Sequence, residues 1–291
     1  MTQIHHRFAE VGGRALYYRE AGPAGAPVIV LLHGFPASSF MFRRLIPLLA
    51  DRWHVIAPDL LGFGHSDMPP VTEFPYSFEA LTDLTQDLLR QLGVRRFAMY
   101  VQDYGAPVGW RLALRDPEAV TAIVTQSGNA YEEGMNEAFF ETQRGYWKEQ
   151  TPETEAVARQ ALTLEATRWQ YVTGVADSSV VDPDTWEGDY GLLTRPGNDL
   201  VQLRLFADYA TNVELYPRVQ QYFRDSQVPL LAVWGRHDPV FDPVGAQAFV
   251  RDLPRAEVHL LEGGHFLLES ALDEVASIVR EFLAEHLDRR R

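Results

Sequence analysis

Short apolar runs that alternate with amphipathic stretches are the feature that most limits the fold of this 291-residue chain. Residues 28–32 (VIVLL) form a continuous apolar run, which is typical of a strand buried on both faces of a sheet. Similar runs occur at residues 53–57, 96–101 and 120–125, and at 229–234 and 257–261 after a long interval. The repeated strand–helix order predicts a mostly parallel central sheet with right-handed crossover connections.

The segments between these runs carry turn and helix signals. Gly12 and Gly13 separate two β-rich runs at residues 8–11 and 15–19, which predicts a hairpin with a primed turn. Apolar residues recur on one helical face from residue 78 to residue 92, after Ser77 as a suitable N-cap. Residues 105–114 and 272–287 are further predicted helices.

The alternation stops near residue 132 and resumes near residue 228. No buried-strand run occurs between these points, whereas stretches such as residues 155–169 have helical character. We therefore predict an α/β core that is formed by residues 1–132 and 221–291. A helical cap is predicted as an insertion at residues 133–220.

Composition excludes several classes of function. The 40 acidic residues outnumber the 26 basic ones, and the resulting net charge of −14 would repel nucleic acid and anionic membranes. The chain has no cysteine, which excludes a thiol nucleophile and a cysteine-ligated metal site. The first residues lack the apolar segment of a signal peptide, and no apolar run is long enough to span a bilayer. We expect a soluble, cytoplasmic monomer or homodimer with no cofactor and no metal site.

Acid–base residues follow three of the predicted strands, where open parallel sheets place their reactive groups. Asp103 lies at a strand-to-helix turn, Asp238 follows the strand at 229–234, and His265 follows the strand at 257–261. The order acid, acid, histidine repeats the nucleophile, acid, histidine order of the α/β-hydrolase fold, with aspartate in the place of the nucleophile.

The loop after the first buried strand strengthens this interpretation. It reads His33-Gly34-Phe35-Pro36, and such folds place an oxyanion loop at this point. Gly34 allows the backbone to approach a reacting atom closely. The backbone N–H groups of Phe35 and Tyr104 are therefore the expected oxyanion-hole donors.

The chain resembles the epoxide hydrolase and haloalkane dehalogenase branch of the α/β-hydrolases over nearly its whole length. The resemblance rests on five short motifs in the family's order: HGFP at 33–36, GFGHSD at 62–67, QDYG at 102–105, GRHD at 235–238 and GGH at 263–265. It implies an α/β-hydrolase fold with helices on both sides of a mostly parallel sheet and an inserted helical cap. It also implies that Asp103 is the nucleophile, His265 the base and Asp238 the partner of His265.

Aspartate in the place of serine changes the expected reaction. A carboxylate is a weak acyl nucleophile, but it can displace a leaving group from an sp3 carbon. The alkyl ester on Asp103 would then be hydrolysed by a water molecule that His265 deprotonates. The sequence contains no GxSxG motif, so a serine-type esterase ranks last.

The leaving group separates the two branches of the family. An epoxide oxygen needs a proton donor, and the resemblance to epoxide hydrolases points to Tyr209, with Tyr146 as the candidate second cap tyrosine. Haloalkane dehalogenases usually carry Asn and Trp as halide ligands where this chain has Phe35 and Tyr104. We expect an epoxide hydrolase that gives a vicinal diol, with a small apolar epoxide and water as substrates. Phe35, Trp147 and Tyr209 are expected to line an apolar pocket.

Some residues favour other interpretations. Gln102 resembles the dehalogenases more than the epoxide hydrolases, and the Tyr146-Trp147 pair lies about where fluoroacetate dehalogenases carry a His-Trp pair. No arginine follows the nucleophile to hold a substrate carboxylate, which disfavours a haloacid. The alternative is a haloalkane dehalogenase with an atypical halide site, which would take an organohalide. A non-catalytic ligand sensor on a hydrolase scaffold is a further alternative.

Val101 departs from the usual pattern of the nucleophile turn. The residue two positions before the nucleophile is usually small, and here it is valine.

Overall fold

The computed structural model describes residues 3–287, and within them eight strands form one sheet in the order β1-β2-β4-β3-β5-β6-β7-β8. The strands are β1 (His5–Val11), β2 (Arg14–Ala21), β3 (Val28–Leu32), β4 (His54–Pro58), β5 (Phe97–Gln102), β6 (Val120–Gln126), β7 (Leu230–Gly235) and β8 (Glu257–Leu261). β2 pairs antiparallel with β1 and β4, and the remaining pairs are parallel. The predicted hairpin and the mostly parallel sheet are confirmed.

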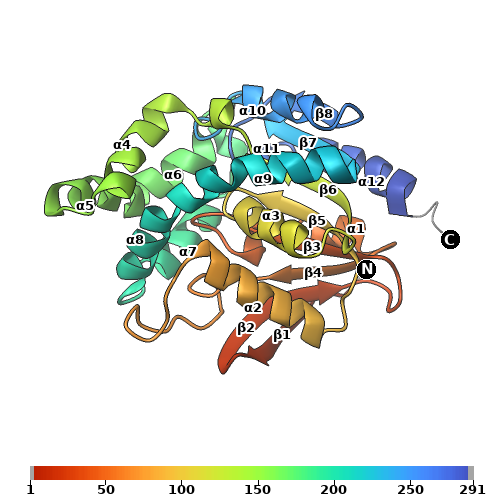
Figure 1. Ribbon diagram of the computed structural model, residues 1–291, viewed down its shortest axis with the longest axis horizontal. Coiled ribbons are helices and arrows are strands. Elements are labelled where there is room, and N and C mark those ends of the chain that lie inside the picture. Colours follow the sequence, from red (N-terminus) through yellow and green to blue (C-terminus); the bar gives the residue numbers. More distant parts are fainter. Residues whose placement is uncertain (1–2, 288–291) are drawn as a thin grey trace.

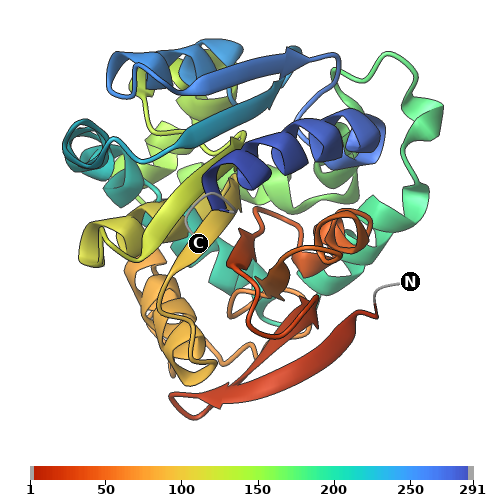
Figure 2. The same ribbon diagram turned by 90° about the vertical axis from the view of Figure 1, so that its right-hand side faces the viewer.

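Helices lie on both faces of the sheet, which gives the molecule three layers (Figures 1 and 2). Helices α2 (Phe78–Gln91) and α3 (Gly105–Arg115) pack on one face, and α1 (Ile46–Leu49) and α12 (Leu272–Leu287) pack on the other. The structure confirms Ser77 as the N-cap of α2, because its hydroxyl accepts the Ala80 N–H at 3.1 Å. Among residues 3–287, no helix combines the length and the apolar character that crossing a membrane requires.

Strand β3 shows why these strands are continuously apolar. Val30 and Leu32 belong to the core on one face of the sheet, whereas Ile29 and Leu31 belong to the core on the other face. Successive side chains of a strand point to opposite faces, so a strand that is covered on both sides buries every position.

The chain between β6 and β7 is helical, as the sequence predicts. Its helices are α4 (Glu137–Lys148), α5 (Pro152–Ala158), α6 (Leu164–Val172), α7 (Pro183–Leu193), α8 (Asn198–Asp208) and α9 (Ala210–Ser226). In Figure 1, α4 to α8 gather at one end of the molecule, while α9 returns along the core and packs on α3. We call residues 132–226 the helical insertion. It extends beyond the boundary predicted at residue 220, and its status as a separate cap domain stays a prediction.

The stretch at residues 155–169 is helical in two pieces rather than one. Helix α5 passes into a 3-10 turn at Arg159–Leu162, and α6 begins at Leu164. The hydroxyl of Thr163 accepts the Ala166 N–H at 3.1 Å and thereby caps α6. A side chain that satisfies the first free N–H groups of a helix lets the chain start a new helix in a new direction.

Candidate active site

Asp103 occupies a sharp turn between β5 and α3. Its φ of 46° lies in the left-handed region, which residues other than glycine rarely adopt. The turn is also crowded, because a Cβ atom on Gly105 would lie 2.1 Å from the carbonyl oxygen of Leu32. The strained turn places the Asp103 side chain at the carboxyl edge of the sheet, where it is 7% exposed.

Val101 fits this turn because two glycines leave room for its branched side chain. A Cβ atom on Gly109 would lie 2.7 Å from Val101 Cγ1, and a Cβ atom on Gly128 would lie 3.0 Å from Cγ2. Contacts below about 3.4 Å are too close for carbon atoms. Small residues on the neighbouring elements therefore replace the small residue that is usual at position 101.

The loop after β3 closes onto the Asp103 carboxylate. A Cβ atom on Gly34 would lie 2.3 Å from Gln102 Oε1 and 2.4 Å from Asp103 Cβ, so this approach requires glycine. The Phe35 N–H donates to Asp103 Oδ1 at 2.7 Å, and the Tyr104 N–H also bonds the carboxylate. Both predicted oxyanion-hole donors thus contact the same side chain.

The Asp103 carboxylate is largely removed from water. Burial raises its pKa, and the neighbouring charge of His265 and the two backbone N–H groups oppose that shift. A carboxylate in such a site carries fewer water molecules that an attack on carbon would have to displace.

His265 and Asp238 form a buried pair at the ends of β8 and β7. His265 Nδ1 lies 3.1 Å from Asp238 Oδ2 and 3.2 Å from Oδ1. The carboxylate also accepts the N–H groups of Val240 at 2.8 Å and Phe241 at 3.0 Å, and the Ser127 hydroxyl at 2.6 Å. These donors take the place of water around a charge that has no solvent exposure.

The environment of His265 suits a general base. Burial acts to lower its pKa, but the charge of Asp238 and the hydrogen bond to it outweigh burial and raise the pKa. The other ring nitrogen, Nε2, lies 2.9 Å from Gln102 Nε2. An amide N–H that donates to Nε2 leaves the imidazole proton on Nδ1, facing Asp238. In this tautomer Nε2 is the basic nitrogen, and it faces Gln102, the neighbour of the nucleophile Asp103.

A cavity of about 40 Å³ lies over Asp103, between the strand ends and the helical insertion. Its walls are mainly aromatic, and they consist of Phe35, Asp103, Tyr104, Phe139, Phe140, Gln143, Trp147, Ala161, Gln170, Phe206, Tyr209 and Val240. A surface hollow of about 650 Å³ lies elsewhere, near the amino ends of β6 and β7, and none of the predicted site residues lines it. The smaller cavity is therefore the candidate active site.

Tyr209 reaches this cavity from the junction of α8 and α9. Its ring stacks on Trp147 at 5.4 Å and lies 5.8 Å from the Tyr104 ring. Its hydroxyl is hydrogen-bonded to Tyr216, which accepts an N–H of Asn129 at 3.3 Å. Burial raises the pKa of Tyr209 well above its ordinary value, so this hydroxyl keeps its proton at neutral pH.

Comparison with known proteins places the chain in a family. A family model described as alpha/beta hydrolase fold matches residues 27–272. The chain belongs to the α/β-hydrolase family. An uncharacterized hydrolase of Saccharomyces cerevisiae is 43% identical to it over 292 residues, which cover 98% of this chain and 100% of the yeast protein.

Further relatives come from both predicted branches. Epoxide hydrolase A of Mycobacterium tuberculosis is 38% identical over 122 residues, which are 42% of this hydrolase and 38% of the relative. The crystal structure of haloalkane dehalogenase DbeA from Bradyrhizobium elkani has a TM-score of 0.76 at 25% identity, and the match covers 98% of this chain and 100% of that one. The predicted fold and family resemblance are confirmed.

Tyr146 of this hydrolase does not line the cavity, in contrast to the prediction. Gln143 and Trp147 of the same helix do line it. Consecutive helical residues are rotated by about 100°, so Tyr146 points to a different side of α4 than Trp147 does. The charged groups that act on its hydroxyl are Glu155, Arg204 and Arg159. The structure thus brings Tyr209 to Asp103 but leaves Tyr146 among α5 and α8.

Two polar cavity residues were not predicted from the sequence. Gln170 of α6 is buried and Gln143 of α4 is half-buried, and both line the cavity. Within residues 3–287, neither side-chain amide has a hydrogen-bond partner in the protein. Helix α6, which carries Gln170, has no strong amphipathic pattern, so a polar residue there looks in the sequence like a solvent-facing one.

Proposed function

We propose that this hydrolase opens epoxides to vicinal diols through a covalent ester on Asp103. The observation that carries the proposal is the shared cavity of the buried Asp103 carboxylate and the protonated Tyr209 hydroxyl. The carboxylate is suited to attack on an sp3 carbon. The tyrosine is suited to protonate an alkoxide, which an epoxide generates and a halide does not.

The first step forms the ester. Asp103 Oδ2 attacks a ring carbon, the bond between that carbon and the ring oxygen breaks, and Tyr209 gives its proton to the oxygen. Oδ1 becomes the carbonyl oxygen of the ester, and it already accepts the Phe35 N–H at 2.7 Å. The donor is therefore in place before charge develops on this oxygen.

The second step hydrolyses the ester. His265 takes a proton from water, and the resulting hydroxide attacks Cγ of Asp103. The N–H groups of Phe35 and Tyr104 stabilise the negative charge on Oδ1, and Asp238 stabilises the protonated imidazole. Collapse releases the diol and restores the carboxylate. His265 loses its proton to solvent and Tyr209 regains one, so the net change is the addition of one water.

Gln170 is the second hydrogen-bond donor of this proposal, in the place predicted for Tyr146. It is 4% exposed, it lines the cavity, and its amide has no partner among the described residues. An amide on the wall of a cavity can donate to a ligand or to a water molecule there. An epoxide oxygen between Gln170 and Tyr209 would accept from the amide and from the Tyr209 hydroxyl, which would turn to it from Tyr216.

One observation favours haloalkane dehalogenation as the second candidate. The Trp147 side chain lines the cavity, and an indole N–H can hold a departing halide. The positions of the usual halide ligands, however, hold Phe35 and Tyr104, whose side chains supply no comparable pair of N–H donors. This alternative therefore ranks below the epoxide.

The test is to trap the ester. A His265→Gln variant should form the ester but fail to hydrolyse it, and it would be incubated with epoxides and haloalkanes of matched chain length. Mass spectrometry should show Asp103 carrying the mass of a whole epoxide, whereas an alkyl group with release of halide would indicate the dehalogenase. The double variant with Asp103→Asn is the control and should carry no adduct. Tight binding of a ligand with no adduct across both classes would favour the sensor.

The proton donor is tested by two matched tyrosine variants. Tyr209→Phe should lower kcat for an epoxide by about 10²-fold, which is typical for the loss of one general acid. Tyr146→Phe should keep kcat within about twofold, because this ring lies off the cavity. Equal losses in the two variants would contradict the assignment of Tyr209.

A further inference from the structure

We propose that Arg111 is a positioning residue that holds Tyr209 in place relative to Asp103. The inference rests on the proposed function, since Tyr209 is the proton donor of that reaction. Arg111 is 6% exposed and belongs to α3, the helix that begins two residues after Asp103. A side chain fixed to α3 is therefore fixed to the nucleophile turn.

Tyr209 lies at a break between two helices. Helix α8 ends at Asp208 and α9 begins at Ala210, so Tyr209 is the single residue between them. The backbone of Tyr209 keeps helical angles. Its N–H donates to the Phe206 carbonyl oxygen at 3.3 Å, and its carbonyl oxygen accepts the Asn212 N–H at 2.9 Å, both with the 3-10 spacing that is common at helix ends. Its position therefore depends also on what fixes the start of α9 and the end of α8.

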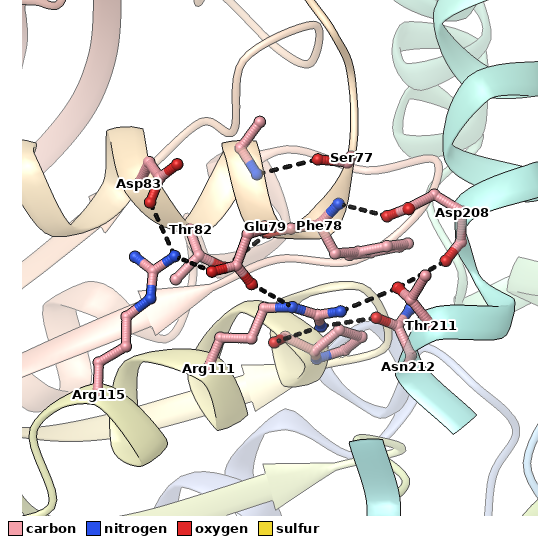
Figure 3. A network of polar contacts seen from close by, with 12 residues as sticks. Ser77, Phe78, Glu79, Thr82, Asp83, Arg111, Arg115, Asp208, Thr211 and Asn212 are labelled. Atoms are coloured by element: carbon pink, nitrogen blue, oxygen red, sulfur yellow. Dashed lines mark hydrogen bonds and ion pairs between the residues drawn. The ribbon is translucent and has the colours of Figure 1, made fainter. Parts of the chain in front are cut away.

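Arg111 fixes the start of α9, as Figure 3 shows. Its Nη1 donates to Asn212 Oδ1 at 2.7 Å, and its Nη2 donates to Thr211 Oγ1 at 3.0 Å. Thr211 in turn donates its hydroxyl to the carbonyl oxygen of Asp208 at 2.8 Å. One guanidinium thus bonds the first turn of α9 and, through Thr211, reaches the residue before Tyr209.

Asp208 fixes the other side of the junction to the core. Its Oδ2 accepts the N–H of Phe78, the first residue of α2, at 2.7 Å (Figure 3). The Phe78 ring then contacts both Tyr209, at 5.8 Å, and Tyr104, at 4.9 Å. Asp208 before Tyr209, and Thr211 and Asn212 after it, are therefore bonded to helices of the core.

The guanidinium itself is held at a fixed orientation. Its Nε donates to Glu79 Oε2 at 3.2 Å, and its Nη1 also donates to the carbonyl oxygen of Pro107 at 3.2 Å. A planar group with several donors in fixed directions can bridge three elements at once, whereas a lysine cannot. Arg111 joins α2, α3 and α9 in this way.

This rigidity matters for proton transfer. A general acid must lie within hydrogen-bond distance of the oxygen that it protonates. A displacement of about 1 Å, caused by a change far from the chemistry, can cost about 10²-fold in rate. Loosening the junction should therefore slow the step that uses Tyr209.

Arg115 is the matched control. It lies one turn further along α3 and shares Glu79 with Arg111, but its remaining contacts are with Asp83 and Gln86 of α2. Figure 3 shows Arg115 on the side of the network away from α9. It therefore has the same charge, helix and acidic partner, without the bond to the Tyr209 junction.

The experiment measures single-turnover ester formation with an epoxide in the His265→Gln background. Arg111→Met should slow ester formation by about tenfold or more, whereas Arg115→Met should stay within about twofold. Asn212→Leu removes one acceptor and leaves Arg111 paired with Glu79, and it should also slow ester formation. Arg111→Lys should recover only part of the loss. Unchanged rates in both Arg111→Met and Asn212→Leu would overturn the inference.

Coupling to Tyr209 separates positioning from a general structural effect. In a Tyr209→Phe background, Arg111→Met should cause no further loss, because the group that it positions is already gone. A loss of the same size in that background would overturn the inference. If Tyr209→Phe alone keeps the full rate, the proposed proton donor fails. If Tyr209→Phe slows the step and Arg111→Met does not, only the positioning role fails.

Discussion

His265 Nδ1 lies 3.1 Å from Asp238 Oδ2, and neither side chain has any exposure to solvent. An amide in place of the carboxylate would donate to Nδ1 and move the imidazole proton to Nε2, where the lone pair is needed. Asp238→Asn should therefore slow ester hydrolysis by about 10³- to 10⁴-fold and leave ester formation nearly unchanged. Rapid-quench mass spectrometry would show the ester accumulating.

A neighbouring carboxylate provides the control for this prediction. Asp242 lies on the same loop but accepts a hydrogen bond from Asn136 and makes none with His265. Asp242→Asn should hydrolyse the ester at the wild-type rate. Slower ester formation in Asp238→Asn, with no accumulation, would contradict the role of Asp238 as partner of the base.

The pKa of His265 should change during the reaction. The charge of Asp103 is one of the causes that raise this pKa, after the charge of Asp238 and its hydrogen bond, while burial lowers it. The ester of Asp103 is neutral, so the negative charge that helps to raise the pKa of His265 disappears, while burial still lowers that pKa. We expect the pKa to fall when the ester forms, which frees the base at the step that needs it.

This shift is measurable as two pH midpoints. Ester hydrolysis requires unprotonated His265, so its rate should rise with pH through the pKa of the ester state. Single-turnover kinetics give that midpoint, and NMR titration of the imidazole gives the pKa in the free enzyme. The kinetic midpoint should be the lower of the two. A kinetic midpoint equal to or above the NMR value would refute the prediction.

Local sequence patterns predicted the strands and helices of the α/β core. The bounds of β8 and α12 agree with residues 257–261 and 272–287. Helix α12 shows its amphipathic periodicity directly, whereas β8 is the edge strand of the sheet and can be found from its mostly apolar run. Asp103, Asp238 and His265 could be found from the same strand pattern, since each lies in the loop that follows a strand. Parallel strands bring their carboxyl ends to one edge.

The helical insertion could be predicted only as helical. The direction of Tyr146 depends on which side of α4 faces Asp103, and this follows from packing with α5 and α8 rather than from α4 itself. Gln170 and Arg111 depend on contacts between distant segments in the same way. Arg111 is separated from Asn212 by 101 positions, and nothing within α3 indicates that partner.

Gly109 should be required because Val101 occupies the turn before the nucleophile. Alanine normally stabilises the interior of a helix relative to glycine by about 1 kcal/mol. Here its Cβ would lie 2.7 Å from Val101 Cγ1 and 3.1 Å from Met99 Sδ, and overpacking of this kind costs about 1–3 kcal/mol. Gly109→Ala should therefore lower the free energy of unfolding, as measured by urea denaturation.

Removing the branch from Val101 should reverse that effect. In the Val101→Ala background, Gly109→Ala should be neutral or stabilising, because the main steric conflict is gone. Gly145 of α4 is the control, since a Cβ atom there meets nothing within 4 Å. Gly145→Ala should stabilise the protein in either background. If Gly109→Ala lowers the free energy of unfolding equally in the wild-type and the Val101→Ala backgrounds, the steric conflict does not involve Val101.

Asp189 of α7 should make the stability depend on pH. The carboxyl is 4% exposed, and burial raises its pKa to about 7, although a hydrogen bond from the Tyr171 hydroxyl opposes the shift. The folded protein therefore binds more protons at this site than the unfolded chain between about pH 4 and pH 7. The free energy of unfolding should fall as the pH rises through this range and stay low above it.

Asp189→Asn should remove this dependence. The amide oxygen can still accept the Tyr171 hydroxyl, and no charge has to be buried above pH 7. The pKa of Asp189 rises from 3.8 in the unfolded chain to about 7 in the folded protein. At about 1.4 kcal/mol for each tenfold change in proton affinity, the variant should gain at most about 4 kcal/mol in free energy of unfolding at pH 8. At pH 4 its gain in free energy of unfolding should be close to zero. Thermal melts of the variant at both pH values test this, with Asp184→Asn on the exposed side of the same helix as control. An equal rise of Tm at pH 4 and pH 8 would mean that packing, and not the buried charge, causes the effect.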